Sequence, residues 1–588
     1  MTHTLHLPST DAEVYGGAHA EWLRDILERL PRLQCLIVNG VSFFDHASLL
    51  ALRYPSLRWR STHRGASPVY GLRLLDASGC INATPQGLAD TLSRFQELVS
   101  VNLSHTHAAR DRAVLSRLKH LPNLRTLNIR GLKLVDSDFE IVAMSIGTRA
   151  RSLDISANHL TDLSIRYLVR YCLNDIAALP ENLAERADGE NGETPLSGGF
   201  EYSAVDHLDT YIQRKFTQGF TGSLAIERSN VIGVTHLYAS LNNLTHDGIS
   251  ALLRTGALQV LDVGRLSSVH EQFGSFMVKG AQKMRTPAVE LLTPTLAEYC
   301  SHRLTYLRIN HTIVTKVGAS DHTVLNAHNQ STDNIQSVWE ANKQQSPVLT
   351  VDDRELQSKA RRTNDIFLHP GMLPKLRTLV LSDVPTKTPQ PMIAYRLIQF
   401  VKSCAEEAKM ARTRAKSTYA LPPGRSRMVA EREHALTLFA LRRIVLEMTS
   451  TDLVVQRVHE PHVEQQRKSY TEDEDSEALW QAAAHDFSFF QEEEEAATAR
   501  WENRDAGRLP LPTLEVTTRT SLPARGIPHL VDVLAEISKY RIPGKAAYQS
   551  AIENGNWDAV PEGHWTGDIT IIRKPRDGQG RNMDQCRY

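Results

Sequence analysis

Three side chains in an acidic part of the chain have the donor atoms of a metal site. They are His459, His462 and Glu464, within the run HEPHVE. Imidazole nitrogens and carboxylate oxygens bind zinc and related ions. The spacing of these residues matches no established ligand frame, however, and the surrounding run is polar. We therefore interpret this segment as a solvated linker and expect neither a metal nor another cofactor.

Two aspartates, Asp76 and Asp154, have the residue type of a general acid and base. They occupy equivalent positions of a repeat, three repeats apart. Because stacked strands lie ~4.8 Å apart, the two carboxylates are expected at a separation of ~15 Å. The paired carboxylates of glycosidases lie about 5–10 Å apart. The predicted distance therefore argues against an acid and base pair.

Motifs for nucleotide binding, zinc proteolysis and serine hydrolysis are missing from the sequence. It contains no GxxxxGK[ST], GxGxxG, HExxH or GxSxG. Gly544 and Lys545 are adjacent but lack the upstream glycine of a phosphate loop. These observations predict a protein that is not an enzyme.

The candidate residues are positioned by a repeat with the frame L-x-x-L-x-L-x-x-(N/C/T/L). Four successive copies begin 26 residues apart, at Leu72, Leu98, Leu124 and Ala150. The alternating apolar positions predict a short strand with one face inward. A single unit cannot bury its apolar face, so the units must stack. Further copies begin at Leu33, Val234, Leu258, Leu304, Leu376 and Leu441.

The segment that returns the chain to the next strand has helical spacing. After Leu160, the run TDLSIRYLVRYC places Leu163 and Tyr167 on a period of ~3.6 residues, with Thr161 or Asp162 as the N-cap. After Leu244, a second such run ends at Gly256. Asn158 and Asn242 occupy the polar slot of the frame. We expect both to be buried and to satisfy backbone groups of the turn.

This frame resembles the leucine-rich-repeat family, in particular its ribonuclease-inhibitor-like and cysteine-containing classes. The 26-residue period is similar to that of the cysteine-containing class, and Cys80 occupies its cysteine slot. The resemblance implies an α/β solenoid with a parallel concave sheet, convex helices and, in this chain, irregular insertions.

We expect four parts along the chain: an N-terminal capping helix, the solenoid, an acidic and partly disordered segment, and a small C-terminal element, at 1–32, 33–450, 451–511 and 512–588. Three insertions interrupt the solenoid, near 176–228, 319–350 and 402–432. The last of these is basic and is interpreted as a solvated loop. The alternatives are binding to nucleic acid or an acidic lipid, and pairing with the acidic runs at 472–495. The C-terminal element is expected to contain a helix at 527–540 and a strand at 564–574.

Small polar residues follow the strand positions that face the concave side. Such faces are typical protein-binding surfaces of solenoids, and the alternative is a solvated face with no partner. The predicted binding residues are Asp76, Ser78, Asn102, Ser104, Asn128, Arg130, Asp154, Ser156, Tyr238 and Asp262.

The overall charge limits the kinds of partner. Lys+Arg and Asp+Glu both number 67, so no global field attracts nucleic acid or an anionic membrane. The first residues lack the pattern of a secretory signal, and the six cysteines lack CxxC spacing. We expect a monomeric intracellular protein, cytoplasmic or nuclear, that binds one or more proteins.

These features favour a non-enzymatic scaffold or adaptor. One alternative is an F-box-like substrate receptor of a ubiquitin ligase, because cysteine-containing repeats are common in that family. Another is a regulator of a small GTPase, because the leucine-rich GTPase activators carry an acidic tail after their repeats.

Overall fold

The computed structural model describes ten stretches of the chain: residues 2–8, 19–62, 70–173, 207–228, 233–267, 289–316, 367–417, 427–449, 530–554 and 560–573. Several predicted features lie outside the described residues. They are the HEPHVE segment, the insertion near 319–350, the part of the insertion near 176–228 that precedes residue 207, and the acidic segment 451–511.

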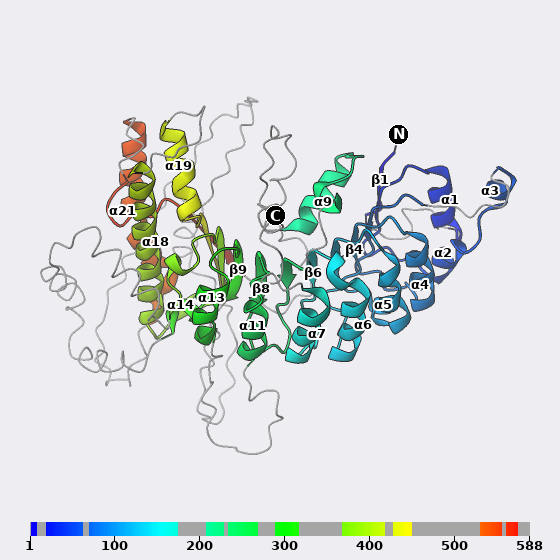
Figure 1. Cartoon of the computed structure of the whole chain (residues 1–588), viewed down its shortest axis with the longest axis horizontal. Helices are drawn as coiled ribbons and strands as arrows, with labels where there is room; N and C mark the ends of the chain where they lie inside the picture. The colour runs from blue at the N-terminus through cyan, green and yellow to red at the C-terminus, as the bar shows by residue number, and fades with distance from the viewer. Residues whose placement is uncertain are drawn as a thin grey trace, which may run out of the picture.

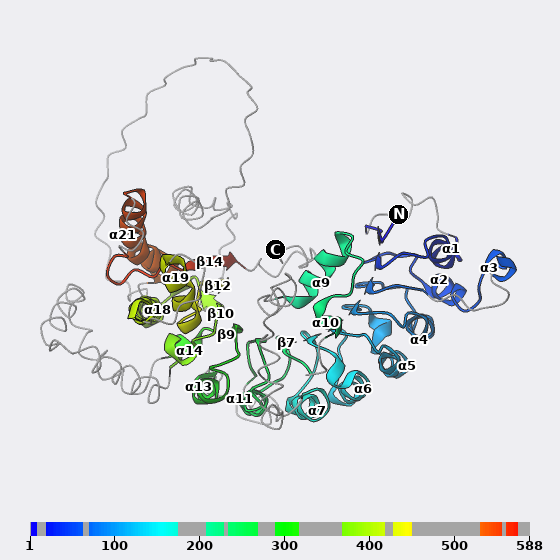
Figure 2. The same cartoon turned by 45° about the horizontal axis from the view of Figure 1, so that its top comes forward.

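Within the described residues, twelve parallel strands form one curved sheet, in which neighbours follow each other in chain order (Figures 1 and 2). The strands are β1 (Thr4–His6), β2 (Cys35–Ile37), β3 (Leu74–Asp76), β4 (Ser100–Asn102), β5 (Thr126–Asn128), β6 (Ser152–Asp154), β7 (His236–Tyr238), β8 (Val260–Gly264), β9 (Tyr306–Asn310), β10 (Thr378–Pro385), β12 (Arg443–Thr449) and β14 (Asp568–Arg573). Two short strands, β11 (Lys387–Thr388) and β13 (Val531–Asp532), pair antiparallel beside it.

The middle residue of each short strand points into the core, as the repeat frame predicts. Leu75, Val101, Leu127 and Leu153 pair in register across β3 to β6, and each is at most 2% exposed. Burying a side chain of this size stabilises the fold by about 1.5–3 kcal/mol.

Helices cover the outer side of the sheet and leave the inner side concave (Figure 2). They are α2 (His46–Ala51), α4 (Pro85–Arg94), α5 (Arg112–Arg117), α6 (Asp136–Ile146), α7 (Asp162–Cys172), α11 (His246–Leu253), α13 (Thr293–Tyr299) and α14 (Thr312–Thr315). This arrangement confirms the predicted α/β repeat solenoid.

The inward face of α7 differs from the predicted one. Thr161 is the N-cap, and its hydroxyl accepts a hydrogen bond from the Leu163 backbone N–H. Leu163 itself is 42% exposed, whereas Ile165, Leu168 and Cys172 are buried. Both sets have helical spacing, so the period alone did not select between them.

Buried asparagines link successive repeats, as predicted. Asn158 Nδ2 donates to the carbonyls of Ile129 and Ile155, at 3.1 and 2.8 Å. Its Oδ1 accepts from the backbone N–H groups of Leu132 and Leu134 at 3.1 and 3.0 Å. Asn242 makes the corresponding contacts one strand further along.

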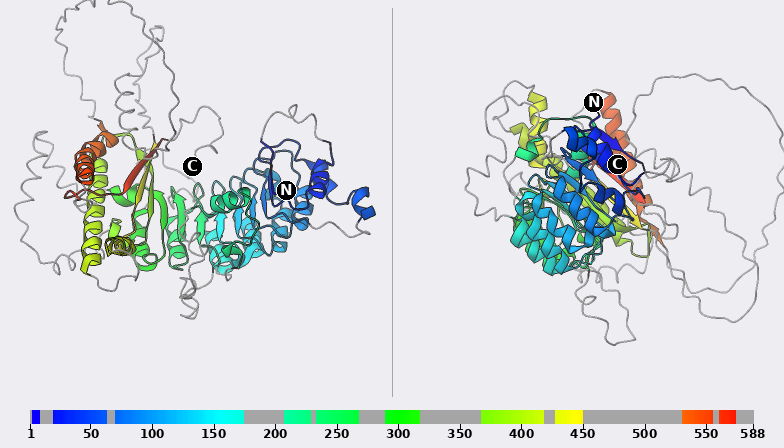
Figure 3. Two further views of the ribbon diagram at one scale, coloured as in Figure 1. Left: turned by 90° about the horizontal axis from the view of Figure 1, so that it is seen from above. Right: turned by 90° about the vertical axis from the view of Figure 1, so that its right-hand side faces the viewer.

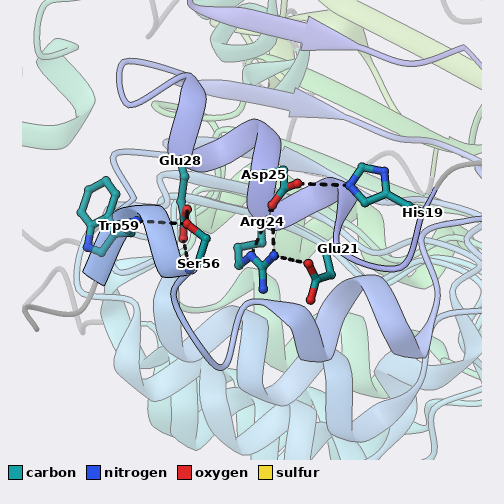
Figure 4. Close-up of polar contacts among 7 residues, drawn as sticks. All are labelled: His19, Glu21, Arg24, Asp25, Glu28, Ser56 and Trp59. Atoms are coloured by element: carbon teal, nitrogen blue, oxygen red, sulfur yellow. Dashed lines mark hydrogen bonds and ion pairs between the residues drawn. The ribbon is translucent and has the colours of Figure 1, made fainter. Parts of the chain in front are cut away.

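The first repeat is covered by α1 (Trp22–Arg29), where the sequence predicts a capping helix, and β1 extends the sheet beyond it. Trp22 Nε1 donates to the Phe43 carbonyl at 3.0 Å. Figure 4 shows the polar contacts around α1, in which Arg24 binds Glu21 and Asp25. Glu28 accepts from the backbone N–H of Ser56 at 2.9 Å, just before α3 (Leu57–Thr62).

The far end of the solenoid carries three longer helices: α18 (Met392–Ser417), α19 (Arg427–Leu438) and α21 (Val533–Glu553). α18 packs against both others (Figure 3). The loop predicted for 402–432 is thus wrong for the described residues there. The Lys and Arg residues of this stretch favoured a loop, but Leu397, Val401 and Cys404 form a buried helical face beneath them.

The C-terminal region continues the main sheet. The helix predicted at 527–540 is observed only from Val533 onward, as α21, which continues to Glu553, and Val531–Asp532 before it form β13. The strand predicted at 564–574 is observed as the shorter β14, Asp568–Arg573. β14 pairs in parallel with β12 from Asp568 to Arg573, so it is the last strand of the solenoid sheet. Among the described helices, none has both the length and the apolar character required to cross a bilayer.

Candidate protein-binding face

The predicted binding residues form a ladder across the concave side of the sheet. Asp76, Asn102, Asn128 and Asp154 are register partners on β3 to β6. The ladder then continues through Tyr238 to Asp262. Parallel pairing therefore places these residues side by side, as the repeat spacing predicts.

The aspartates and asparagines of this ladder have a structural role that we did not predict. In each repeat, Oδ1 accepts a hydrogen bond from the backbone N–H two residues later. The donors are the backbone N–H groups of Ser78, Ser104, Arg130 and Ser156, at 3.2, 3.1, 3.1 and 2.9 Å. These Asx-type contacts end each strand and turn the chain toward the convex side.

Five of the ten predicted residues are not available to a partner as the chain is folded here. Ser104, Asp154, Ser156, Tyr238 and Asp262 are 7, 4, 1, 2 and 4% exposed. The expectation of an open row was therefore wrong for this half of the set. Asp76, Ser78, Asn102, Asn128 and Arg130 remain partly exposed.

Part of the concave face is covered by the chain itself. The insertion between β6 and β7 contains α9 (Leu208–Thr217) and α10 (Ala225–Arg228), and residues 207–228 are called the docked segment below. Figure 2 shows α9 on the inner side of the arc, opposite the convex helices. Leu208, Ile212 and Phe216 are at most 1% exposed. They form a second apolar cluster with residues of the sheet, namely Cys35, Ile37, Leu74 and Val99.

Two arginines, each one residue before a strand of the sheet, hold the docked segment by hydrogen bonds. Arg125 donates from Nε to the Ile226 carbonyl and from Nη2 to the Glu227 carbonyl, both at 3.0 Å. Arg73 donates to the Gly222 carbonyl at 2.8 Å and forms an ion pair with the Glu227 side chain. The guanidinium of Arg73 also lies 4.3 Å from the centroid of the Phe216 ring. Burial lowers the pKa of Arg125, and Glu227 opposes this shift.

The beginning of α9 contacts strands further along the sheet. His207 Nδ1 lies 3.2 Å from the hydroxyl of Tyr238, and the two rings stack with centroids 5.8 Å apart. The His207 ring also meets the edge of Tyr306 at 5.5 Å. These contacts contribute to the burial of Tyr238.

Asp262 is buried because it belongs to an ion network. Arg308 on β9 donates to Asp262 Oδ1 on β8 and to both carboxylate oxygens of Glu447 on β12, each at 2.7 Å. Burial alone would lower the pKa of Arg308, but the two carboxylates outweigh it and raise the pKa. Beside this network lie the buried apolar side chains Tyr238, Val260, Tyr306, Val380 and Val445.

A small cleft remains between α9 and the sheet, with a volume of about 40 Å³. It is lined by Asp209 and Gln213 of α9 and by the ladder residues Asp76, Asn102, Asn128 and Asp154. Pockets for drug-sized ligands and cofactors measure about 300–1,000 Å³. The cleft is therefore suited to a few water molecules or the end of one side chain. Among the described residues, no cluster of His, Cys, Asp or Glu is arranged to hold a metal.

The residues that hold the docked segment were missed at the level of sequence, although two signals were present. Leu208, Ile212 and Phe216 are spaced by four residues, which is typical of one apolar helix face. Arg73 and Arg125 occupy equivalent positions two repeats apart. Neither signal, however, identifies the surface that these side chains contact.

Comparisons with known proteins add little. No protein-family model and no curated protein matches the chain. A solved structure of a complex of Rad7 and Elc1 in yeast matches over 74% of each chain, with 13% identity and a TM-score of 0.29. A TM-score this low does not establish a common fold, so the solenoid is assigned from the strand ladder and its convex helices.

Proposed function

We propose that this chain is a non-enzymatic scaffold or adaptor that binds another protein on the concave face of its solenoid. The observation that carries the proposal is the docked segment. The face already binds a helix through apolar side chains and through hydrogen bonds from Arg73 and Arg125. A surface that holds one helix of polypeptide has the chemistry to hold another.

The partly exposed part of the ladder is the proposed contact surface. It consists of Asp76, Ser78, Asn102, Asn128 and Arg130, which lie next to α9 on a rigid sheet. Rigid backbone reduces the entropy lost when a partner binds. Polar side chains at such positions select a partner by hydrogen bonding and charge.

Affinity purification with mass spectrometry tests this proposal. The variant combines Asn102→Asp, Asn128→Asp and Arg130→Glu, which retain the Oδ1 acceptors of the strand ends while making the face strongly negative. A control variant carries Arg112→Glu and Arg117→Glu on the exposed side of α5.

We expect partners that co-purify with the wild type and with the control, and that are lost by tenfold or more with the concave variant. Circular dichroism establishes that both variants are folded. Retention of the same partners by a folded concave variant would contradict the proposal.

A further inference from the structure

Basic side chains follow one face of α18. Lys402, Lys409, Arg412 and Lys416 are spaced by seven, three and four residues, and a helix brings such positions onto one side. Lys409 and Lys416 are exposed, whereas Lys402 and Arg412 are half-buried. The helix dipole favours basic residues in the last turn, which accounts for Lys416 but not for the three earlier residues. These four residues are called the basic stripe below.

Positive charge is in excess around the basic stripe. In the described parts of 402–432, seven Lys or Arg residues stand against three Glu residues. Of the three, Glu407 is buried, and Glu431 pairs with Arg427 at 2.7 Å. Glu406 is therefore the exposed carboxylate of α18, and it cannot offset four basic side chains. The local field at this end of the solenoid is positive, although the chain as a whole is neutral.

The start of α19 adds apolar surface beside the end of the basic stripe. Arg427 Nη2 donates to the Lys416 carbonyl at 3.5 Å, so the end of α18 and the start of α19 lie together (Figure 1). Met428 and Val429 follow Arg427 and are 66 and 42% exposed. A ligand that complements this surface must carry carboxylates together with large apolar side chains.

Residues 472–495 of the same chain have this composition. They contain ten Asp or Glu residues and no Lys or Arg. From Thr449, the last residue of β12, 22 residues lead to Glu472, and a chain of that length spans up to about 75 Å. Since α19, which leads into β12, is only about 18 Å long, the segment can reach the basic stripe. Its large apolar residues are Leu479, Trp480, Phe487, Phe489 and Phe490.

We infer that residues 472–495 bind in cis to the basic stripe and the start of α19. The carboxylates of the segment pair with the stripe, while its aromatic side chains cover Met428 and Val429. Because both partners belong to one chain, binding is favoured by a high effective concentration. An acidic partner protein, a nucleic acid or an acidic lipid would reach this surface only by displacing the segment. This inference concerns the far end of the solenoid and goes beyond the function proposed for the concave face.

Carbodiimide coupling tests the contact in the full chain, because this reagent joins amines only to carboxylates that touch them. The reaction is run at low protein concentration, so that links form within one chain, and the linked peptides are identified by mass spectrometry. We expect Lys409 and Lys416 to be linked to residues 472–495 at least tenfold more often than Lys119 and Lys133, two exposed lysines of the early repeats. These links should be lost in about 0.5 M NaCl, which screens exposed charges. Equal linking of all four lysines would overturn the inference.

A peptide supplied in trans gives a second measurement. The probe is a fluorescent peptide of residues 472–495, followed by anisotropy. The receptor is the full chain in which each residue of Glu492–Glu495 is changed to Gln, which weakens the competing segment. We expect this receptor to bind the probe at least tenfold more tightly than the wild-type chain does. Adding Lys409→Glu and Lys416→Glu to the receptor should weaken probe binding at least tenfold.

The matched control makes the same change of charge on the early repeats. Lys119→Glu with Lys133→Glu should leave binding of the probe unchanged. Equal binding of the probe to the wild-type chain and to the receptor would overturn the inference, as would an equal loss in the two pairs of lysine variants. The other occupants are tested with a single-stranded DNA oligonucleotide and with vesicles of phosphatidylserine and phosphatidylcholine. If either bound the wild-type chain through Lys409 and Lys416 as tightly as it bound the receptor, the surface would be open and the inference wrong.

Discussion

Arg308 and Glu447 are joined by two parallel hydrogen bonds of 2.7 Å, from Nε to Oε1 and from Nη2 to Oε2. The two residues lie on β9 and β12, with β10 between them. A third bond, to Asp262, extends the network to β8. The network therefore joins residues of three strands, β8, β9 and β12, and spans β10 between them, at the point where the strands become longer.

Removal of this guanidinium should destabilise the fold. Arg308→Met leaves two carboxylates in a buried site without their cation, and breaking a buried pair in this way costs about 3–5 kcal/mol. Urea denaturation measures the loss. Arg427→Met is the matched control, because Arg427 pairs with Glu431 on an exposed helix surface, where such pairs contribute about 0–1 kcal/mol. Equal losses of unfolding free energy in the two variants would show that the Arg308 network stabilises the fold no more than an exposed ion pair does.

Loss of the buried hydrogen bonds of Asn158 should also destabilise the fold. Asn158→Ala removes the acceptor of the Leu132 and Leu134 backbone N–H groups and leaves both buried. Since an unsatisfied buried group costs about 1–3 kcal/mol, we expect the unfolding free energy to fall by about 3 kcal/mol. Asn123→Ala removes a single exposed contact with Glu97 and should change it by less than about 0.5 kcal/mol. A loss of unfolding free energy below about 1 kcal/mol for Asn158→Ala would contradict the proposed role of Asn158.

Gly248 provides a test of the contact between α7 and α11. Asp162 accepts from the backbone N–H of Thr245 at 2.9 Å and also from its hydroxyl, and a Cβ atom on Gly248 would overlap this carboxylate. Alanine normally stabilises a helix by about 1 kcal/mol relative to glycine. We expect Gly248→Ala to lower the melting temperature instead. Gly71→Ala, where no heavy atom lies within 4 Å of the added group, should leave it nearly unchanged.

Stability should decrease in mild acid. Burial lowers the pKa of His311 from 6.5 to about 4, although Asp383 opposes the shift. Below pH 6.5 the unfolded chain therefore binds a proton that the folded chain does not. The contribution of the neutral His311 side chain to the free energy of unfolding is fully present above pH 6.5. It is lost as the pH falls toward 4, by a total of about 3 kcal/mol.

Denaturation at pH 7.0 and 4.5 measures this dependence. His311→Gln, which keeps a polar group near Thr315, should reduce the difference between the two values. An unchanged difference would assign the acid sensitivity to other groups, among them His564, whose pKa burial also lowers to about 4.

Local patterns predicted the repeated part of the fold. The apolar alternation around Leu75 and Leu127 defined the strands, and the equal spacing of their repeats defined the parallel stack. Asn158 was assigned its structural role from its slot in the frame. The Asx-type contacts could also have been predicted from the sequence, because each pair, Asp76 with Ser78 and Asn102 with Ser104, is only two residues apart. The outward position of these residues does not by itself distinguish this turn-forming role from binding a partner.

The missed features depend on contacts between distant parts of the chain. The spacing of Leu208, Ile212 and Phe216 indicates an apolar face but not the strands that cover it. Arg308 and Glu447 are separated by 139 residues, and neither has a local signature of pairing. The basic residues of α18 dominated the interpretation of 402–432, whereas the buried helical face was decided by packing against α19 and α21.

The position of the docked segment has a consequence for how the chain folds during synthesis. β6 ends at Asp154 and its neighbour β7 begins only at His236, so the docked segment leaves the ribosome between them. The surface that it covers, from Cys35 to Val99, has by then been made. The early repeats and the docked segment thus have all the partners needed to fold as one unit before β7 is translated. Once docked, His207 lies beside the place that Tyr238 will take, and this shortens the loop that must close for the later repeats to stack.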